Sequence, residues 1–131
     1  MQDNLNRRVR LARKAAEAGV LQKIDGGYRV PSRTLVYHHI VFARFYRDAN
    51  EAGYRMTCHY ELDDGTMRCP GNQFGHICWH CLATMVRAAP GPIAFFEDKA
   101  GADRYARLGG KLVAIRSGDG SGKLWAVVRG A

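Results

Sequence analysis

The sequence predicts an α+β fold with an N-terminal helix, an antiparallel β-hairpin followed by a helix, and a C-terminal βαββ unit. Three observations support this prediction: a helical apolar stripe near the N-terminus, extended runs around an Asp-Gly turn, and alternating strand-like and helix-like segments after Pro90. The 131 residues are 47 % hydrophobic and 24 % charged, a balance typical of a folded globular protein.

The first predicted element is a helix over residues 3–19. Asp3 can act as its N-cap and Gly19 can end it. The apolar stripe consists of Leu5, Val9, Leu11, Ala12, Ala15 and Ala16. Basic side chains at spacings of three and four, Arg7, Arg10 and Lys14, share the opposite face, which is either a solvated surface or a phosphate-contacting row.

Two short extended pieces follow, at residues 20–24 and 28–30, around the turn that begins at Asp25. Residues 35–46 are rich in Val, Ile, Phe and Tyr, which favours a buried strand. Ser32 can equally cap a helix that runs to Gly53, so the sequence leaves the choice between strand and helix open here.

The clearest β signal is a hairpin with strands at residues 54–61 and 66–69. If Asp63 and Asp64 are its two loop residues, Cys58 lies directly opposite Cys69 on the same face. If the turn centres on Asp64 and Gly65 instead, this register shifts.

The remaining pattern predicts a helix over residues 78–89, which ends before Pro90. A βαββ unit follows, with strands at 92–96, 111–117 and 123–129 and a helix at 97–108. We therefore expect three parts: a basic helix and β lead-in (1–53), a hairpin–helix unit (54–90) and a βαββ tail (91–131) that packs on this unit or is appended to it.

All four cysteines and three of the five histidines lie between Cys58 and Cys81. With no apolar leader at the N-terminus we expect a cytoplasmic protein, in which such a cluster indicates a metal site before disulfides. Zinc takes four tetrahedral Cys or His ligands, which two hairpin thiolates and two residues at a helix N-terminus can supply. The second pair is either Cys78 with His80 or Cys78 with Cys81. His38 or His39 can also join a site, but only one of these neighbours can face inward on a strand, and a core or surface role is favoured for both.

The run from Cys69-Pro70 through a Gly-containing loop to Cys78-Trp79-His80-Cys81 resembles the SWIM zinc finger of small bacterial and phage proteins. That family places Cys-x-Cys on a hairpin and Cys-x-His at the start of a helix. The resemblance implies zinc ligation by Cys69, Cys78 and His80. The first Cys of the family pattern falls on Met67, so Cys58 is inferred as the substitute fourth ligand, and Cys81 is the alternative to His80.

The net charge of +8 is concentrated before Cys58, where 11 basic and 5 acidic residues give +6. Together with the resemblance, this predicts a non-enzymatic zinc-binding module that binds DNA or RNA. The candidate contact residues are Arg7, Arg10, Lys14, Arg29, Arg33 and Arg55. The alternative is a protein-interaction adaptor or a phage or mobile-element regulator that binds a host protein. No apolar stretch is long enough to predict a membrane span.

Overall fold

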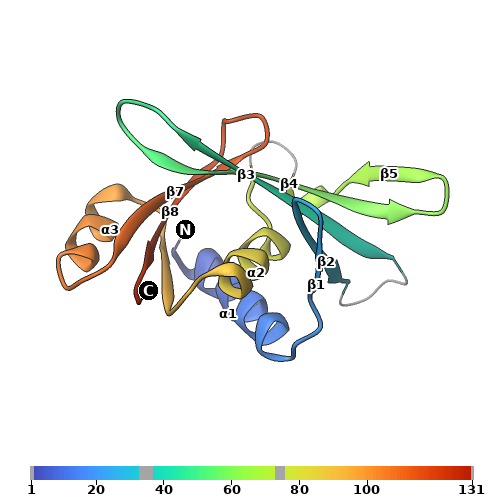
Figure 1. The fold of residues 1–131 in the computed structure, drawn as a ribbon, viewed down its shortest axis with the longest axis horizontal. Coiled ribbons are helices and arrows are strands. Elements are labelled where there is room, and N and C mark those ends of the chain that lie inside the picture. Colours follow the sequence, from blue (N-terminus) through green and yellow to red (C-terminus); the bar gives the residue numbers. More distant parts are fainter. Residues whose placement is uncertain (1, 33–36, 73–75, 131) are drawn as a thin grey trace.

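The computed structural model describes residues 2–32, 37–72 and 76–130. Within them the chain is mixed α+β, as the sequence predicted, and it consists of three α-helices and one eight-stranded mixed sheet (Figure 1). The helices are α1 (Gln2–Glu17), α2 (Trp79–Ala88) and α3 (Lys99–Ala106), and a short 3-10 helix, η1, spans Pro70–Asn72. The strands are β1 (Gln22–Ile24), β2 (Gly27–Pro31), β3 (His38–Arg47), β4 (Ala52–Leu62), β5 (Gly65–Arg68), β6 (Ile93–Phe96), β7 (Lys111–Ser117) and β8 (Lys123–Val128).

The β4–β5 hairpin has the predicted register. Leu62 pairs with Gly65, so Asp63 and Asp64 are the two loop residues. The backbone N–H of Cys69 donates to the carbonyl of Cys58 over 3.0 Å. Cys58 and Cys69 therefore lie opposite each other, and the shifted register centred on Asp64 and Gly65 is wrong.

The segment that the sequence left open is a strand. β3 pairs with β2 on one side and β4 on the other, so the helix alternative is wrong where the structure describes these residues. Residues 33–36, which include Arg33, lie outside the described residues. At the N-terminus, α1 begins at Gln2, so Asp3 lies inside the helix and not at its N-cap position.

The eleven-residue strand β4 is the branch point of the sheet. One of its edges pairs with β3. Its other edge pairs with β5 at one end and, in parallel, with β7 at the other, through residues 53–56. Strand β7 then pairs with β8, which pairs with β6. The βαββ tail therefore extends the same sheet that carries the hairpin.

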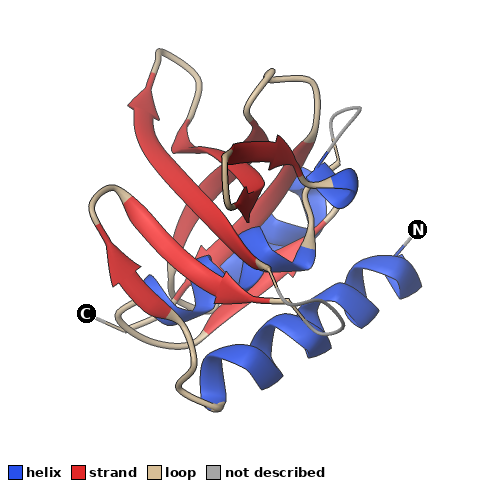
Figure 2. Ribbon diagram, turned by 90° about the vertical axis from the view of Figure 1, so that its right-hand side faces the viewer, coloured by secondary structure: helices blue, strands red, loops and turns tan. Residues whose placement is uncertain are grey.

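The sheet curves around α2, and α1 packs against α2 on the same side (Figures 1 and 2). Residues that alternate along β8 divide between two cores: Leu124 and Ala126 pack in the larger core with both helices, and Trp125 and Val127 pack under α3 on the opposite face. We call the face that points away from α1 and α2 the outer face; α3 covers its β6–β8 end.

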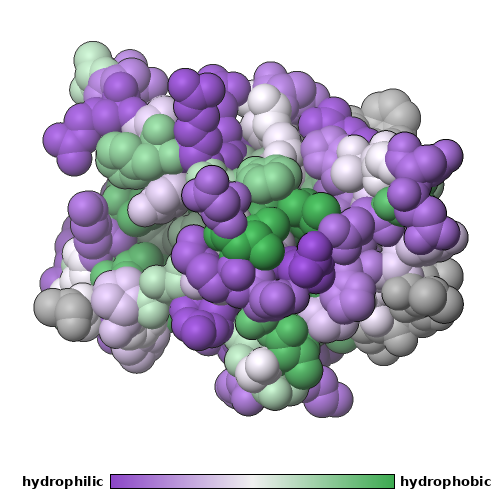
Figure 3. Space-filling view, turned by 45° about the vertical axis from the view of Figure 1, so that its right-hand side comes forward, coloured by the Kyte–Doolittle hydropathy of each residue, from purple (hydrophilic) through white to green (hydrophobic). Residues whose placement is uncertain are grey.

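Two arginines attach α1 to the rest of the molecule. Arg8 donates to the carbonyl of Ile77, and Arg13 donates to the carbonyl of Ile93 over 2.6 Å. Among the described residues, no helix is both long and apolar enough to cross a bilayer. In the view of Figure 3, hydrophobic patches lie between hydrophilic side chains.

Candidate metal centre

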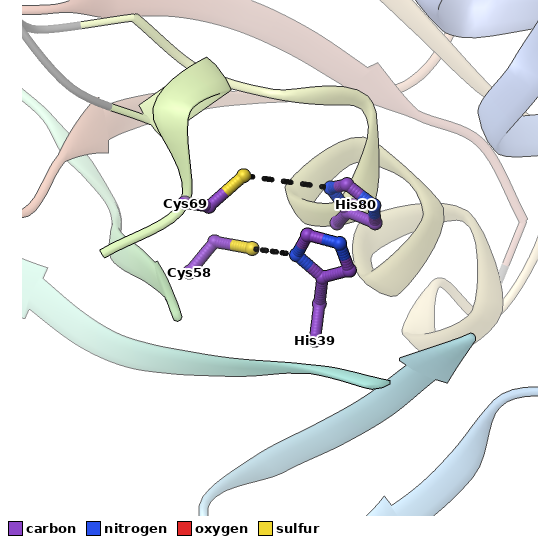
Figure 4. Close-up of side chains that lie close together, drawn as sticks. All are labelled: His39, Cys58, Cys69 and His80. Atoms are coloured by element: carbon purple, nitrogen blue, oxygen red, sulfur yellow. Dashed lines mark hydrogen bonds between the residues drawn. The ribbon is translucent and has the colours of Figure 1, made fainter. Parts of the chain in front are cut away.

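Four buried side chains from four parts of the fold meet at one point. His39 comes from β3 and Cys58 from β4; Cys69 follows β5 directly, and His80 lies in the first turn of α2 (Figure 4). One ligand atom from each lies within 4.8 Å of all the others, and no side chain is more than 6 % exposed. The hairpin, the neighbouring strand and the helix N-terminus thus form a closed His/Cys cluster that can hold a metal ion.

The spacing inside the cluster fits a tetrahedral ion. Around zinc, ligand bond lengths place a sulfur and a nitrogen about 3.6 Å apart, and two sulfurs about 3.8 Å apart. The Cys58 Sγ to His39 Nδ1 distance is 3.5 Å, and the Cys69 Sγ to His80 Nδ1 distance is 3.9 Å. These two distances match edges of the coordination tetrahedron, and the other ligand atoms lie within 4.8 Å of one another.

Burial lowers the pKa of His39 and so favours the neutral ring that a metal site needs. Desolvation, reinforced by the nearby His80, lowers the pKa of His39 to about 4. The ring is therefore neutral near pH 7, which is the form that ligates a metal. The rings of His39 and His80 are stacked, with centroids 3.5 Å apart.

Cys78 and Cys81 lie beside the cluster, with their sulfurs 3.7 Å apart. Cys78 precedes the first residue of α2. Hydrogen bonds from Cys58, Cys69 and Cys81 lower the pKa of the Cys78 thiol well below its usual range. The hydrogen bond to Cys78 and complete burial raise the pKa of Cys81. Hydrogen bonds to Cys69 and Cys78 raise the pKa of Cys58 at the same time. The shift at Cys78 therefore reflects a thiolate that accepts hydrogen bonds from its neighbouring thiols, and it does not by itself identify a metal ligand.

The buried side chain of Asn72 hydrogen-bonds to the backbone on two segments next to the cluster. Its side-chain oxygen accepts from the backbone N–H of Cys58 over 3.1 Å, and its amide donates to the carbonyl of His76 over 3.1 Å. The same amide lies 3.7 Å from the Cys81 sulfur. This buried side chain ties the loop before α2 to the strand that carries Cys58. On the helix side, the ring of Trp79 stacks on His80 at 4.0 Å.

No protein-family model matches this chain. Neither a curated protein nor a solved structure shows significant similarity to it. The resemblance to the SWIM zinc finger therefore stays a prediction.

The structure brings three of the four residues of the predicted ligand set, Cys58, Cys69 and His80, into the cluster, with Cys78 next to it. Sequence reasoning favoured a core or surface role for His39, which in fact points at Cys58. The available signal was the His38-His39 pair at the start of a strand, because only one of the two can face inward. His39 is 2 % exposed and His38 is exposed.

The predicted nucleic-acid residues lie on two different surfaces. Arg7, Arg10 and Lys14 are exposed on α1. Arg55 is exposed on β4, and Arg29 on β2 forms an ion pair with Glu61 over 2.8 Å. Arg33 lies outside the described residues.

Proposed function

We propose that this protein is a non-enzymatic, zinc-stabilised module that binds nucleic acid. The observation that carries the proposal is the closed cluster of His39, Cys58, Cys69 and His80. A buried set of four His and Cys side chains with ligand atoms within 4.8 Å of one another suits zinc. The burial of all four side chains suits a structural ion, because catalytic zinc keeps a position for water.

Charge favours His39 as the fourth ligand. Two thiolates balance the charge of Zn²⁺, whereas three leave a buried negative charge with a desolvation cost. The competing ligand is Cys78, which the sequence predicted in one set with Cys58, Cys69 and His80 and which hydrogen-bonds to the sulfurs of Cys58 and Cys69. If His39 is the ligand, the Cys78 thiol is left to hydrogen-bond to the coordinating sulfurs as a supporting group.

The three carboxylates that follow Cys58 most closely in the sequence do not face the cluster. Glu61 lies on the outer face, where it accepts from Arg29 over 2.8 and 3.0 Å. Asp63 and Asp64 are exposed in the hairpin loop. A metal-activated water needs a general base beside the ion, and none of these three residues supports that role.

Metal content tests the zinc site. The protein purified under reducing conditions is analysed for metals, beside single variants of each candidate ligand. We expect one zinc per chain, lost in Cys58→Ser, Cys69→Ser, His80→Ala and His39→Ala, and kept in Cys78→Ser and Cys81→Ser. Loss in Cys78→Ser with retention in His39→Ala would assign Cys78 as the fourth ligand. A metal-free wild-type protein would contradict the proposal.

Nucleic-acid binding is supported by the net charge of +8 and is tested separately. We expect the zinc-loaded protein to bind oligonucleotides at low salt and to lose affinity steeply as salt rises, because phosphate contacts release counterions. A stoichiometric protein band during purification, without any affinity for oligonucleotides, would instead favour the adaptor function.

A further inference from the structure

A row of four basic residues crosses four adjacent strands. Arg44 on β3 is paired with Arg55 on β4, Arg55 with Arg116 on β7, and Arg116 with Lys123 on β8. Directly paired residues project from the same face of a sheet. We call these four residues the basic row.

The basic row projects from the outer face. The sequence neighbours Met56, Ile115 and Leu124 are buried in the core that contains α1 and α2. Side chains alternate between the two faces of a strand, so the row points away from both helices.

Half of the row has no compensating charge. Glu51 accepts from Arg116 over 2.9 Å and from Lys123 over 2.6 Å. Arg44 and Arg55 are exposed, and within the described part of the chain neither forms an ion pair. Like charges directly opposite each other destabilise a sheet. An external anion that binds between these two guanidinium groups relieves that repulsion.

Aromatic rings flank the unpaired arginines on the same face. Phe42, two residues before Arg44 on β3, is 44 % exposed. Its cross-strand partners are Gly27, which has no side chain, and Thr57, so no large side chain is paired beside its ring. On the other side, the guanidinium of Arg55 lies 5.7 Å from the ring of Tyr46. Proteins that bind single strands combine basic side chains, which contact phosphates, with aromatic rings, on which unpaired bases stack.

We infer that the outer face around β3 and β4 binds single-stranded nucleic acid, with phosphates at Arg44 and Arg55 and a base stacked on Phe42. This inference rests on the proposed function and names its surface and substrate class. A single strand fits better than a duplex because a base must be unpaired and turned outward to stack on a ring of an open sheet.

Two exposed arginines of α1, which the sequence predicted as phosphate contacts, form the competing surface of equal charge. Arg7 and Arg10 are exposed like Arg44 and Arg55, but α1 lies on the other side of the sheet (Figure 1). The double variants Arg44→Gln/Arg55→Gln and Arg7→Gln/Arg10→Gln remove the same charge. Their comparison therefore separates a local contact from the effect of net charge.

The experiment measures fluorescence anisotropy of a labelled single-stranded oligonucleotide of about 12 nucleotides with zinc-loaded protein, between about 50 and 200 mM salt. For Arg44→Gln/Arg55→Gln we expect a loss of affinity of at least about tenfold and a salt slope smaller by about 1.4, the value for two phosphate contacts on a single strand. For Arg7→Gln/Arg10→Gln, at the competing surface, we expect a loss of only about twofold, from the lower net charge alone.

Phe42 tests the stacking contact. Phe42→Ala should weaken binding by about 5- to 150-fold with an unchanged salt slope. Phe42→Leu keeps an apolar side chain but not the ring, and should lose affinity as well. Circular dichroism and zinc content are recorded for every variant, so that a misfolded variant is recognised and the more conservative one is used.

Three outcomes would overturn the inference. If the α1 variant loses affinity and the sheet variant does not, the surface is wrong while nucleic-acid binding stands. If a duplex of the same sequence binds as well as the single strand and neither Phe42 variant has an effect, the substrate class is wrong. If the wild-type protein binds no oligonucleotide at the lowest salt, both the inference and nucleic-acid binding fall, and binding to poly-glutamate would then indicate an acidic protein partner.

Discussion

Asn72 links two segments of the chain that contribute to the His/Cys cluster. Its side chain is 1 % exposed and bonds to the backbone on both sides of the cluster, at Cys58 and at His76. Groups that orient metal ligands contribute to affinity although they do not touch the ion.

We expect Asn72→Ala to lower the free energy of unfolding by about 1–3 kcal/mol, because it leaves the buried N–H of Cys58 without an acceptor. Zinc affinity should fall by about 10- to 100-fold. Urea unfolding and competition with a chromophoric chelator measure the two effects. The exposed Asn50→Ala is the control; equal values for both variants would show that Asn72 does not support the site.

Glu51 gives the outer face a defined pH dependence. Hydrogen bonds from Arg116, and then from Lys123 and Tyr46, lower its pKa to about 2 against a desolvation effect that raises it. Because the folded pKa lies below the unfolded value, the stabilisation is complete above about pH 4.5 and is lost as the pH falls toward 2.

We expect Glu51→Gln to reduce the free energy of unfolding by about 1–3 kcal/mol near pH 7, with a smaller difference from wild type at each step below pH 4.5. Denaturant unfolding of both proteins in the same buffers measures this difference, so acid release of zinc affects both alike. A difference that stays constant down to pH 3.5 would mean that the carboxylate does not carry the effect.

At the scale of elements, Gly53 lets β4 and β7 pair. A Cβ at this position would lie 2.1 Å from the carbonyl oxygen of Ala114, a backbone atom that cannot move aside. We expect Gly53→Ala to cost at least about 2 kcal/mol in unfolding free energy. In Gly19→Ala the methyl meets nothing within 4 Å, and only the left-handed backbone (φ 71°) adds about 1–2 kcal/mol. A smaller loss in Gly53→Ala than in Gly19→Ala would contradict the steric argument.

The elements that the sequence predicted correctly are those with local signals. The β4–β5 hairpin follows from its turn residues, and with it the opposition of Cys58 and Cys69. The parallel pairing of β4 with β7 joins residues about sixty positions apart, and no local pattern specifies it. The position of His39 could not be predicted for the same reason. His39 lies next to Cys58 only because β3 pairs with β4, and this pairing is part of the tertiary structure.

At the scale of the whole molecule, we expect a metal ion at the His/Cys cluster to stabilise the tail as well as the hairpin, because both belong to one sheet. Cys58 and the residues that pair with β7 lie on the same strand, β4, so local unfolding at the cluster also disturbs the junction with the tail. Ligand binding to the folded state alone raises its stability, by about 4 kcal/mol at a thousandfold excess over the dissociation constant.

The two tryptophans report on the two halves of this sheet. Trp79 stacks on His80 at the His/Cys cluster, and Trp125 packs beneath α3 in the tail. Trp125→Phe and Trp79→Phe each leave one fluorescent reporter. Within each variant, we expect unfolding followed by its remaining tryptophan to coincide with unfolding followed by circular dichroism, and chelation of zinc to lower both midpoints together. If the Trp125 signal keeps its midpoint after chelation while the Trp79 signal shifts, the tail folds as an independent unit. Coincident shifts would instead show that one ion at the hairpin stabilises a sheet that extends to both ends of the molecule.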